Sequence, residues 1–188
     1  GSIRGAVNEF ILPKLKGKEI ANLEDTLNTL DNALVKNTSA KAAVEMAIFD
    51  LFGKKFNIPV YRLLGGYRNK VETDLTISVN SPEEMAKDSR IAVERGFRIL
   101  KLKVGLNPEL DIQRIKAVKE ATSYDILMRL DDNKGWSTRE AIKIMNEIAW
   151  EVPGIELVEQ PVDAHDIEGL KWVKESITTP VLADEAVF

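Results

Sequence analysis

Hydrophobic residues follow two different spacings along the chain. Up to about residue 68 they recur every three or four positions, as at Leu23, Leu27, Leu30 and Leu34, which predicts helices. From residue 69 onward, short apolar runs alternate with longer amphipathic stretches. The runs predict strands at residues 71–79, 98–103, 126–131, 155–159 and 180–183, and the stretches predict helices at residues 82–95, 108–122, 137–150 and 166–176.

The predicted helices begin at clear start signals. Proline follows a capping residue at Ser81-Pro82 and at Asn107-Pro108, with acidic residues in the first turn. Ser137 stands three residues before Glu140, which is the spacing of a capping box. Such regular alternation of strands and helices is typical of a parallel sheet, in which ligands bind at the carboxyl ends of the strands.

The repeat length narrows the fold class. Each strand-plus-helix unit takes roughly 30 residues, about the length of one unit in a βα barrel of ~250 residues. We therefore predict an α/β fold in which residues 69–188 form about five βα units of a partial TIM-type barrel. A fifth strand left as an unpaired apolar edge is a feature that natural proteins avoid, so we expect further strands outside this chain.

Charged residues end four of the predicted strands. Lys101 and Lys103 close one strand, and Asp131, Glu159 and Asp184 close the next three, 28 and 25 residues apart. Because side chains alternate along a strand, the strand-end charges can all project into one cavity mouth. Three carboxylates at one point repel each other unless a cation lies between them. The sequence therefore predicts a metal site beside a pair of lysines.

The residue types at this site indicate its chemistry. Carboxylate oxygens with no nearby histidine suit a hard cation, Mg²⁺ in preference to Zn²⁺. The sole histidine, His165, lies between Asp163 and Asp166, where we expect a surface role. A lysine acts as a base only when neutral, and a second cation or a metal nearby lowers its pKa. The metal would hold a substrate carboxylate and stabilise the charge that builds up when the α-proton leaves.

Composition excludes several other classes of protein. The 188 residues carry a net charge of −4 with no basic block, which argues against a nucleic-acid partner. No apolar stretch is long enough to span a membrane, and the absence of cysteine excludes disulfides and thiolate metal sites. These features lead us to expect a cytoplasmic protein that acts on a small molecule. The sequence is also compatible with a homo-oligomer.

Four short motifs follow one another at matching spacing: Lys101-Leu102-Lys103, Arg129-Leu130-Asp131-Asp132-Asn133, Val158-Glu159-Gln160-Pro161 and Ala183-Asp184-Glu185. Together they resemble the enolase superfamily, in its muconate-lactonising-enzyme subgroup, and the resemblance covers nearly the whole chain. A lysine or histidine base working with Mg²⁺ is an established pattern of that superfamily. The resemblance implies that residues 1–68 are the helical end of an α+β capping domain, which precedes a (β/α)7β-type barrel.

The resemblance also implies a role for each residue of the site. Asp131, Glu159 and Asp184 would be the Mg²⁺ ligands. Lys103 would be the acid/base on one face of the α-carbon, and Lys101 would stabilise the enolate or orient the carboxylate. Groups around the metal ligands would be Asn133, Glu185 and Arg129, the last as an inward-facing structural partner of the acids.

Within the subgroup, the motifs look most like dipeptide epimerases of the L-Ala-D/L-Glu type, which are isomerases. Alternatives are an N-acylamino acid racemase, an o-succinylbenzoate synthase, or a catalytically incomplete fragment that acts only as a scaffold. An epimerase needs a base on both faces of the substrate, and the family's opposing lysine would follow residue 188. We therefore expect the isolated segment to be inactive.

Three residues depart from the family pattern, and four others are expected to pack or to contact substrate. Asp132 stands where the family usually has alanine, and we expect it to point outward. Lys134 and Ala186 replace the more usual glutamine and serine. Helix packing is expected for Trp136 and Trp172, in preference to contact with substrate. At the end of the first barrel strand, Thr76 and Ser78 are further candidates for substrate contact.

Overall fold

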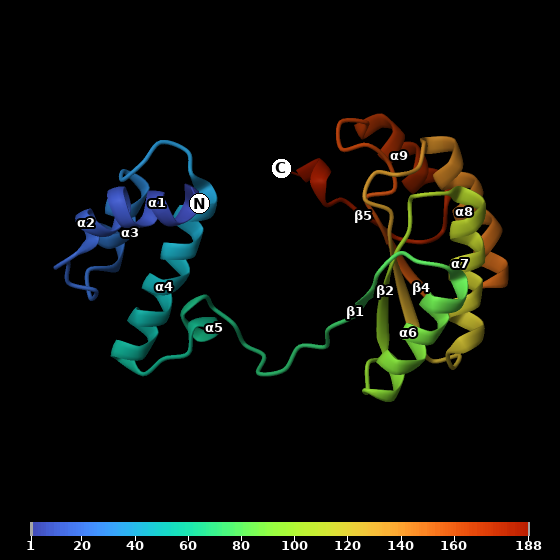
Figure 1. Ribbon diagram of the computed structural model, residues 1–188, viewed down its shortest axis with the longest axis horizontal. Coiled ribbons are helices and arrows are strands. Elements are labelled where there is room, and N and C mark those ends of the chain that lie inside the picture. The colour runs from blue at the N-terminus through green and yellow to red at the C-terminus, as the bar shows by residue number, and fades with distance from the viewer. Residues whose placement is uncertain (1, 188) are drawn as a thin grey trace. The chain divides into compact units, whose positions relative to one another are not determined.

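The computed structural model of the protein describes residues 2–187 and divides into two compact units, with the boundary between Val71 and Glu72 (Figure 1). Helices are the only regular secondary structure among the described residues of the first unit. Its elements are α1 (Ser2–Gly5), the π-helical segment η1 (Ala6–Ile11), α2 (Leu12–Leu15), α3 (Leu23–Asp31), α4 (Thr38–Phe56) and α5 (Val60–Leu63). A small core of its own holds this unit together, formed by Ala6, Ile11, Leu30, Ala33, Ala40 and Ile48.

The second unit alternates strands with helices in strict order. Its strands are β1 (Leu75–Ile77), β2 (Ile99–Lys103), β3 (Leu127–Asp131), β4 (Ile155–Glu159) and β5 (Val181–Leu182). Its helices are α6 (Pro82–Glu94), α7 (Pro108–Ala121), α8 (Thr138–Glu151) and α9 (Ile167–Ser176), and the 3-10 turn η2 (Glu185–Val187) follows β5.

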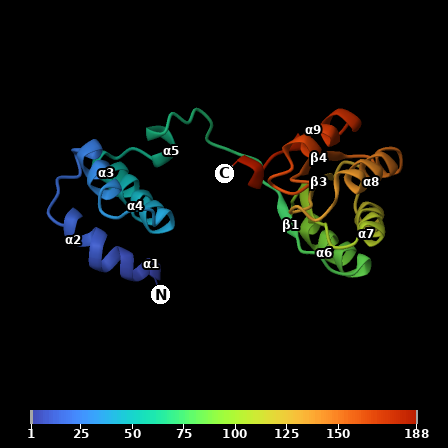
Figure 2. The same ribbon diagram turned by 90° about the horizontal axis from the view of Figure 1, so that it is seen from above.

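The strands form one parallel sheet in the order β1-β2-β3-β4-β5. Seen from above, α6, α7 and α8 flank one face of this sheet (Figure 2). Neighbouring parallel strands that are consecutive in sequence, each followed by a helix on the same side, are the arrangement of a partial βα barrel. The predicted α/β fold class is therefore confirmed.

The strands at the two edges of the sheet are shorter than the sequence predicts. β1 covers Leu75–Ile77 of the predicted residues 71–79, and β5 covers Val181–Leu182 of the predicted 180–183. Each edge strand has a hydrogen-bonded partner on one side only, β2 or β4 respectively. Fewer ladder hydrogen bonds therefore define the length of each edge strand. The three inner strands end at the predicted residues, Lys103, Asp131 and Glu159.

The predicted helix starts are present as hydrogen bonds. The Ser81 side chain accepts a hydrogen bond from the Glu84 amide, and the Asn107 side chain accepts one from the Leu110 amide. At the start of α8, Ser137 and Glu140 cap each other's backbone amides, which completes the predicted capping box. These caps satisfy amides that the first helical turn leaves without a partner.

Alternation along the strands separates an apolar face from a charged face. Side chains that point toward the helices are fully buried, namely Leu100, Leu102, Met128, Leu130 and Val158. Each contributes about 1.5–3 kcal/mol through burial. Lys101, Lys103 and Arg129 lie on the opposite face and stay partly exposed. Packing on one face thus fixes where the charged side chains of the other face project.

Candidate active site

Strand register brings the candidate residues together at one end of the sheet. Lys103 on β2 pairs with Asp131 on β3, and Asp131 pairs in turn with Glu159 on β4. Glu159 pairs with Leu182 on β5, so Asp184 lies two residues beyond that last pair. The in-register ends of parallel strands therefore place a lysine and two carboxylates side by side.

The two lysines bind these carboxylates directly. Lys103 Nζ lies 2.6 Å from Asp131 Oδ2 and 2.7 Å from Asn133 Oδ1. Lys101 Nζ lies 2.8 Å from Asp131 Oδ2 and 2.8 Å from Glu159 Oε2. The Asp131 side chain is only 2% exposed and the Glu159 side chain 12% exposed. Both ammonium groups therefore share one shielded carboxylate.

These contacts set the charge of Lys101. Burial is the strongest single influence and lowers the pKa of Lys101, but hydrogen bonds and the charges of Asp131 and Glu159 together outweigh it, so the net pKa is raised. The sequence led us to expect that a neighbouring cation lowers the pKa of a catalytic lysine, and at Lys101 the carboxylates reverse that effect. Lys101 is thus a cation at neutral pH, suited to stabilising negative charge.

Asp131 responds in the opposite sense. Burial is the strongest single influence and raises the pKa of Asp131, but the hydrogen bonds and charges of Lys101 and Lys103 together outweigh it, so the net pKa is below the usual value. Asp131 therefore stays ionised at neutral pH. An ionised, shielded carboxylate next to a second one is a suitable pair of donors for a hard divalent cation.

The third acid is placed differently from the first two. Asp184 follows β5, and its backbone amide donates to the side chain of Gln160 at 3.0 Å. Within residues 2–187, no three acidic or histidine side chains lie close enough to enclose a metal ion. Asp131 and Glu159 are bridged by Lys101 instead. The donor chemistry of three successive strand ends fits Mg²⁺, while the closed three-carboxylate cluster suggested by the sequence is not formed.

Backbone strain gathers in the loops that follow β3 and β4. Asn133, Lys134 and Gln160 have φ angles of 47°, 70° and 38°, in the left-handed region that non-glycine residues rarely adopt. Each such residue costs of order 1–3 kcal/mol and persists where surrounding contacts enforce it. Here the Lys134 amide donates to the Gln160 carbonyl at 3.0 Å, which joins the two strained loops.

Two glycines allow the loops after β2 and β3 to touch through their backbones. A Cβ atom at Gly135 would lie 2.1 Å from the Gly105 carbonyl oxygen, and one at Gly105 would lie 2.2 Å from the Asp132 carbonyl oxygen. No side chain fits at these distances. The close approach holds the segment after Lys103 against the segment after Asp131.

Asp132 is buried, and the expectation that it points outward is wrong. Its side chain is 2% exposed, and Oδ2 accepts a hydrogen bond from the Trp136 amide at 2.8 Å. Oδ1 is buried without a hydrogen-bond partner among the described residues. Burial, aided by the charges of Asp111 and Asp131, raises the pKa of Asp132 to about 7. The loop's tight turn toward Trp136 draws the carboxyl inward.

Asp111 is a buried residue of the site region that the sequence did not single out. It is 0% exposed, and its Oδ2 accepts hydrogen bonds from the Gly105 amide at 2.9 Å and from Trp136 Nε1 at 3.1 Å. Its Oδ1 accepts from Arg114 Nη1 at 2.7 Å, and Arg114 Nε reaches the Asn80 carbonyl. One carboxylate thus connects two strand-to-helix loops directly and a third through Arg114. An acid in a first helical turn ordinarily signals an exposed, dipole-favoured position, which is why sequence reasoning passed over it.

Arg129 lies on the charged face but contacts other acids than the predicted ligands. Its Nη1 lies 2.9 Å from Asp74 Oδ2, and its Nε lies 2.6 Å from Glu156 Oε2. A β-bulge makes the second contact available, because Met128 pairs with Ile155 while Arg129 pairs with Leu157. Arg129 on β3 therefore links the residue just before β1 to β4.

The remaining candidates occupy varied positions. Glu185 Oε1 lies 3.5 Å from Lys134 Nζ, and Asn133 contributes its amide to Asp131 Oδ1 as well as its side chain to Lys103. Trp136 is 3% exposed, as helix packing requires, whereas Trp172 is 62% exposed and does not meet that expectation. The remaining side chains in question are exposed, namely Thr76, Ser78 and His165.

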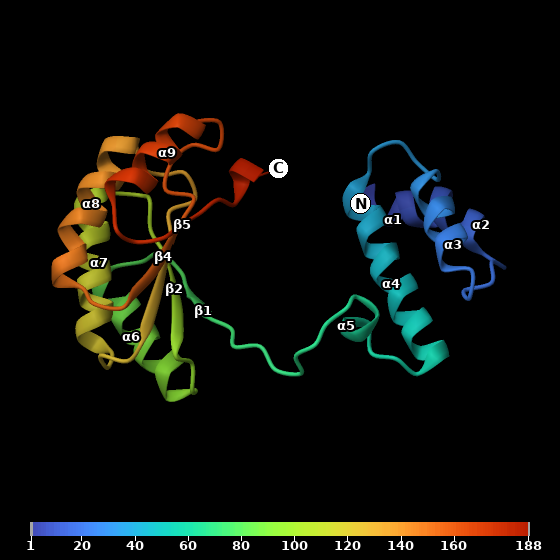
Figure 3. The ribbon, with the colours of Figure 1, turned by 180° about the vertical axis from the view of Figure 1, so that it is seen from behind.

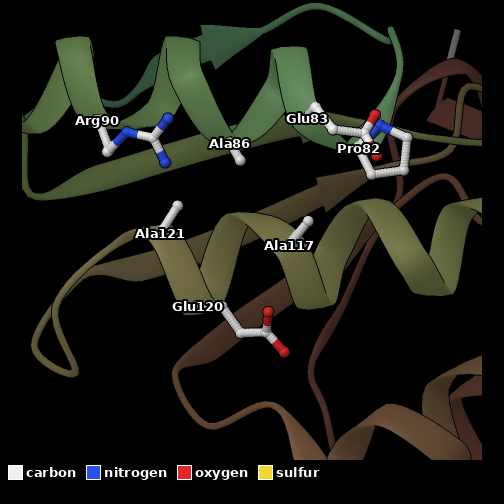
Figure 4. Close-up of a pocket in the computed structure, with 7 residues that line it drawn as sticks. All are labelled: Pro82, Glu83, Ala86, Arg90, Ala117, Glu120 and Ala121. Atoms are coloured by element: carbon white, nitrogen blue, oxygen red, sulfur yellow. The ribbon is translucent and has the colours of Figure 1, made fainter.

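A groove of about 380 Å³ lies between α6 and α7, away from the strand-end charges (Figure 4). Alanines line it, together with Arg90, Glu83 and Glu120, and none of the candidate catalytic or metal-binding residues takes part. No helix among the described residues is long and apolar enough to cross a membrane.

A parallel βα sheet with lysines and carboxylates at its strand ends defines an α/β protein of the barrel class with one charged site. The chain belongs to the enolase superfamily: the model described as "Enolase C-terminal domain-like" matches residues 84–188, and the model described as "Mandelate racemase / muconate lactonizing enzyme, N-terminal domain" matches residues 1–65. The resemblance inferred from the four motifs is confirmed.

Curated and solved relatives place the chain near one branch of that family. It is 53% identical to an L-Ala-D/L-Glu epimerase of Clostridium acetobutylicum, over 100% of this chain and 52% of the relative. The substrate-liganded L-Ala-D/L-Glu epimerase of Bacillus subtilis is 44% identical, with a TM-score of 0.91 over 98% of this chain and 52% of that one.

A third relative is a dipeptide epimerase of Enterococcus faecalis, solved with Mg and the dipeptide L-Leu-L-Tyr. It is 42% identical, with a TM-score of 0.82 over 89% of this chain and 47% of that one. The chain thus spans about half the length of the curated and solved relatives it matches.

Proposed function

We propose that the protein epimerises dipeptides of the L-Ala-D/L-Glu type, by removing the α-proton on one face and returning a proton on the other. The observation that carries this proposal is the pair Lys101 and Lys103, held at 2.6–2.8 Å from Asp131 at the ends of adjacent strands. The kinship with dipeptide epimerases supports the substrate class.

Each lysine takes the role that its surroundings favour. Lys103 is hydrogen-bonded to Asp131 and Asn133, and this fixed orientation of its Nζ supports Lys103 as the group that moves the α-proton. Lys101 stays charged beside Asp131 and Glu159 and stabilises negative charge on the substrate. General acid–base catalysis by a positioned side chain contributes typically 10²–10⁴-fold in rate.

Asp131, Glu159 and Asp184 are the residues that would hold Mg²⁺. When bound, Mg²⁺ supplies positive charge that anchors the substrate carboxylate and offsets the charge developing on it. Carboxylate donors alone, without histidine or cysteine, match the preference of this ion.

Isotope exchange tests the proposal directly. The protein, prepared at the length of its relatives, should exchange the α-proton of L-Ala-L-Glu for deuterium in D₂O when Mg²⁺ is present, and lose this ability with a chelator. A panel of dipeptides and N-acylamino acids distinguishes the epimerase from an N-acylamino acid racemase. The proposal fails if no member of the panel exchanges; the fragment-scaffold alternative predicts that outcome.

A further inference from the structure

Gln160 directly follows Glu159 and is completely buried. All its side-chain hydrogen bonds go to backbone groups. Nε2 donates to the Val162 carbonyl at 2.9 Å, and Oε1 accepts from the Asp184 amide at 3.0 Å and from the Ala186 amide at 3.1 Å. One side chain therefore connects the end of β4 to the segment after β5.

These bonds fix the orientation of the amide group. A carbonyl oxygen has two lone pairs, and both are used by N–H donors. Turning the amide over would direct its NH₂ group at those two donors, so only one orientation is compatible with the contacts. The backbone at Gln160 is also held at a φ of 38°, an unfavourable conformation that surrounding contacts must enforce.

The Gln160 side chain continues the pairing of β4 with the segment after β5, beyond the point where the backbone ladder ends. β5 is only two residues long, and its last pair joins Glu159 to Leu182. The Gln160 amide adds one more backbone bond, to the Leu182 carbonyl at 2.9 Å, and there the backbone ladder ends. Beyond it, the Gln160 side chain takes the place of strand backbone as the partner of Asp184. From behind, β5 is seen beside β4, leading into the C-terminal turn (Figure 3).

We infer that Gln160 is a positioning residue, which fixes the Asp184 carboxylate relative to Glu159 so that both can bind the same Mg²⁺ ion. The inference rests on the proposed function, because the proposed function is what makes Asp184 a metal ligand. The amide group of Gln160 is fully occupied by backbone partners, so it would act through Asp184 and not as a ligand itself. Groups that orient metal ligands in this way typically change metal affinity 10–100-fold when they are removed.

The test compares Gln160→Met with Gln113→Met, in the protein at the length of its relatives. Methionine keeps the length of the side chain and loses its hydrogen bonds, and Gln113 is the only other glutamine, exposed on α7. Titration calorimetry with Mg²⁺ alone should give a Kd 10–100-fold higher for Gln160→Met and an unchanged Kd for Gln113→Met. Equal Mg²⁺ affinity in the unaltered protein and Gln160→Met overturns the inference while the proposed function stands.

Amide hydrogen exchange, measured without metal, provides a second readout. Gln160→Met should raise the exchange rates of the Asp184 and Ala186 amides, and Gln160→Glu, which keeps an oxygen acceptor, should restore their protection. If Gln160→Met does not fold, the glutamate variant decides: retained protection supports the bridge and lost protection overturns it. If the unaltered protein binds no Mg²⁺, the proposed function falls with the inference, a result that differs from loss of binding in the variant alone.

Discussion

The two faces of the sheet in the second unit are built from the same five strands, but one face forms the apolar core and the other carries the charged residues. On the helix-facing side, Leu102 and Leu130 are completely buried in the hydrophobic core. On the other side, one residue further along the same strands, Lys103 and Asp131 form an ion pair. The comparison teaches that stability and chemistry can be assigned to alternate residues, so that each can be altered with limited effect on the other.

Substitution of adjacent residues should separate the two faces most strongly. Leu102→Ala should lower the free energy of unfolding by about 2–5 kcal/mol, because it removes buried methyl groups and leaves a cavity. Lys103→Ala should lower the rate of α-proton exchange from one epimer by about 10²–10⁴-fold, since the group proposed to transfer the proton is lost. Its effect on stability should be smaller than that of Leu102→Ala, because Lys101 still compensates the charge of Asp131.

Urea denaturation and deuterium exchange, followed for both epimers, measure the two effects. If Lys103→Ala exchanges both epimers at the unaltered rate, Lys103 has no role in proton transfer. If Leu102→Ala is as stable as the unaltered protein, the helix-facing side does not carry the stability that its burial indicates.

The sequence predicted what depends on local order. Strand ends at Lys103, Asp131 and Glu159 follow from apolar runs and alternation, and the cap at Ser137 follows from its spacing to Glu140. Such signals act over a few residues along one element, so they can be read before the fold is known.

Features that depend on distant partners were not predictable. Burial of Asp111 depends on Trp136, which is 25 residues away, and the bridge from Gln160 reaches Ala186, 26 residues on. The position of Glu156 follows from a bulge, which the apolar pattern does not mark. An acid or an amide looks alike in sequence whether it is exposed or buried, and only the fold decides.

Asp132 is an exception to the division between a buried apolar face and a charged face, because it is a titratable group buried in the loop after β3. Its pKa is raised from 3.8 to about 7 in the folded protein, and the unfolded chain keeps the ordinary value. The stability that this shift represents is present below pH ~4 and is lost as pH rises through 7. At about 1.36 kcal/mol per pH unit, the loss amounts to at most about 4 kcal/mol.

Urea titrations between pH 4.5 and 8, with a chelator present, should show this decline in the unaltered protein. Asp132→Asn keeps an oxygen for the Trp136 amide and removes the charge, so its stability should vary much less with pH. The exposed Asp88 serves as control, because Asp88→Asn should leave the decline unchanged. A decline of equal size in Asp132→Asn would assign it to other groups.

On the charged face, Arg129 forms ion pairs that are separate from the Lys101, Asp131 and Glu159 cluster, so we expect it to contribute to stability and not to metal binding. Its ion pairs with Asp74 and Glu156 are partly exposed, with the arginine side chain 28% exposed. Arg129→Met should therefore cost about 1–2 kcal/mol of stability, between the values for exposed and buried pairs. Mg²⁺ affinity should stay within about twofold, because no predicted ligand contacts Arg129 in these pairs. A tenfold loss of Mg²⁺ affinity in calorimetry would instead favour the role around the metal that the family resemblance implies.

The smallest effect should come from the cap that begins α8, directly after the loop that carries Asp132 and Trp136. Ser137→Ala removes the side-chain partner of the Glu140 amide and should lower the free energy of unfolding by about 1 kcal/mol. Ser176→Ala, at the exposed end of α9, is the matched control and should change stability by less than about 0.5 kcal/mol. Proton exchange should be unaffected by either variant, because Asp111 and Asp132 still hold Trp136 through its indole and its amide. A loss of exchange in Ser137→Ala alone would show that the order of this loop depends on the helix cap, and that the two faces of the sheet are coupled through it.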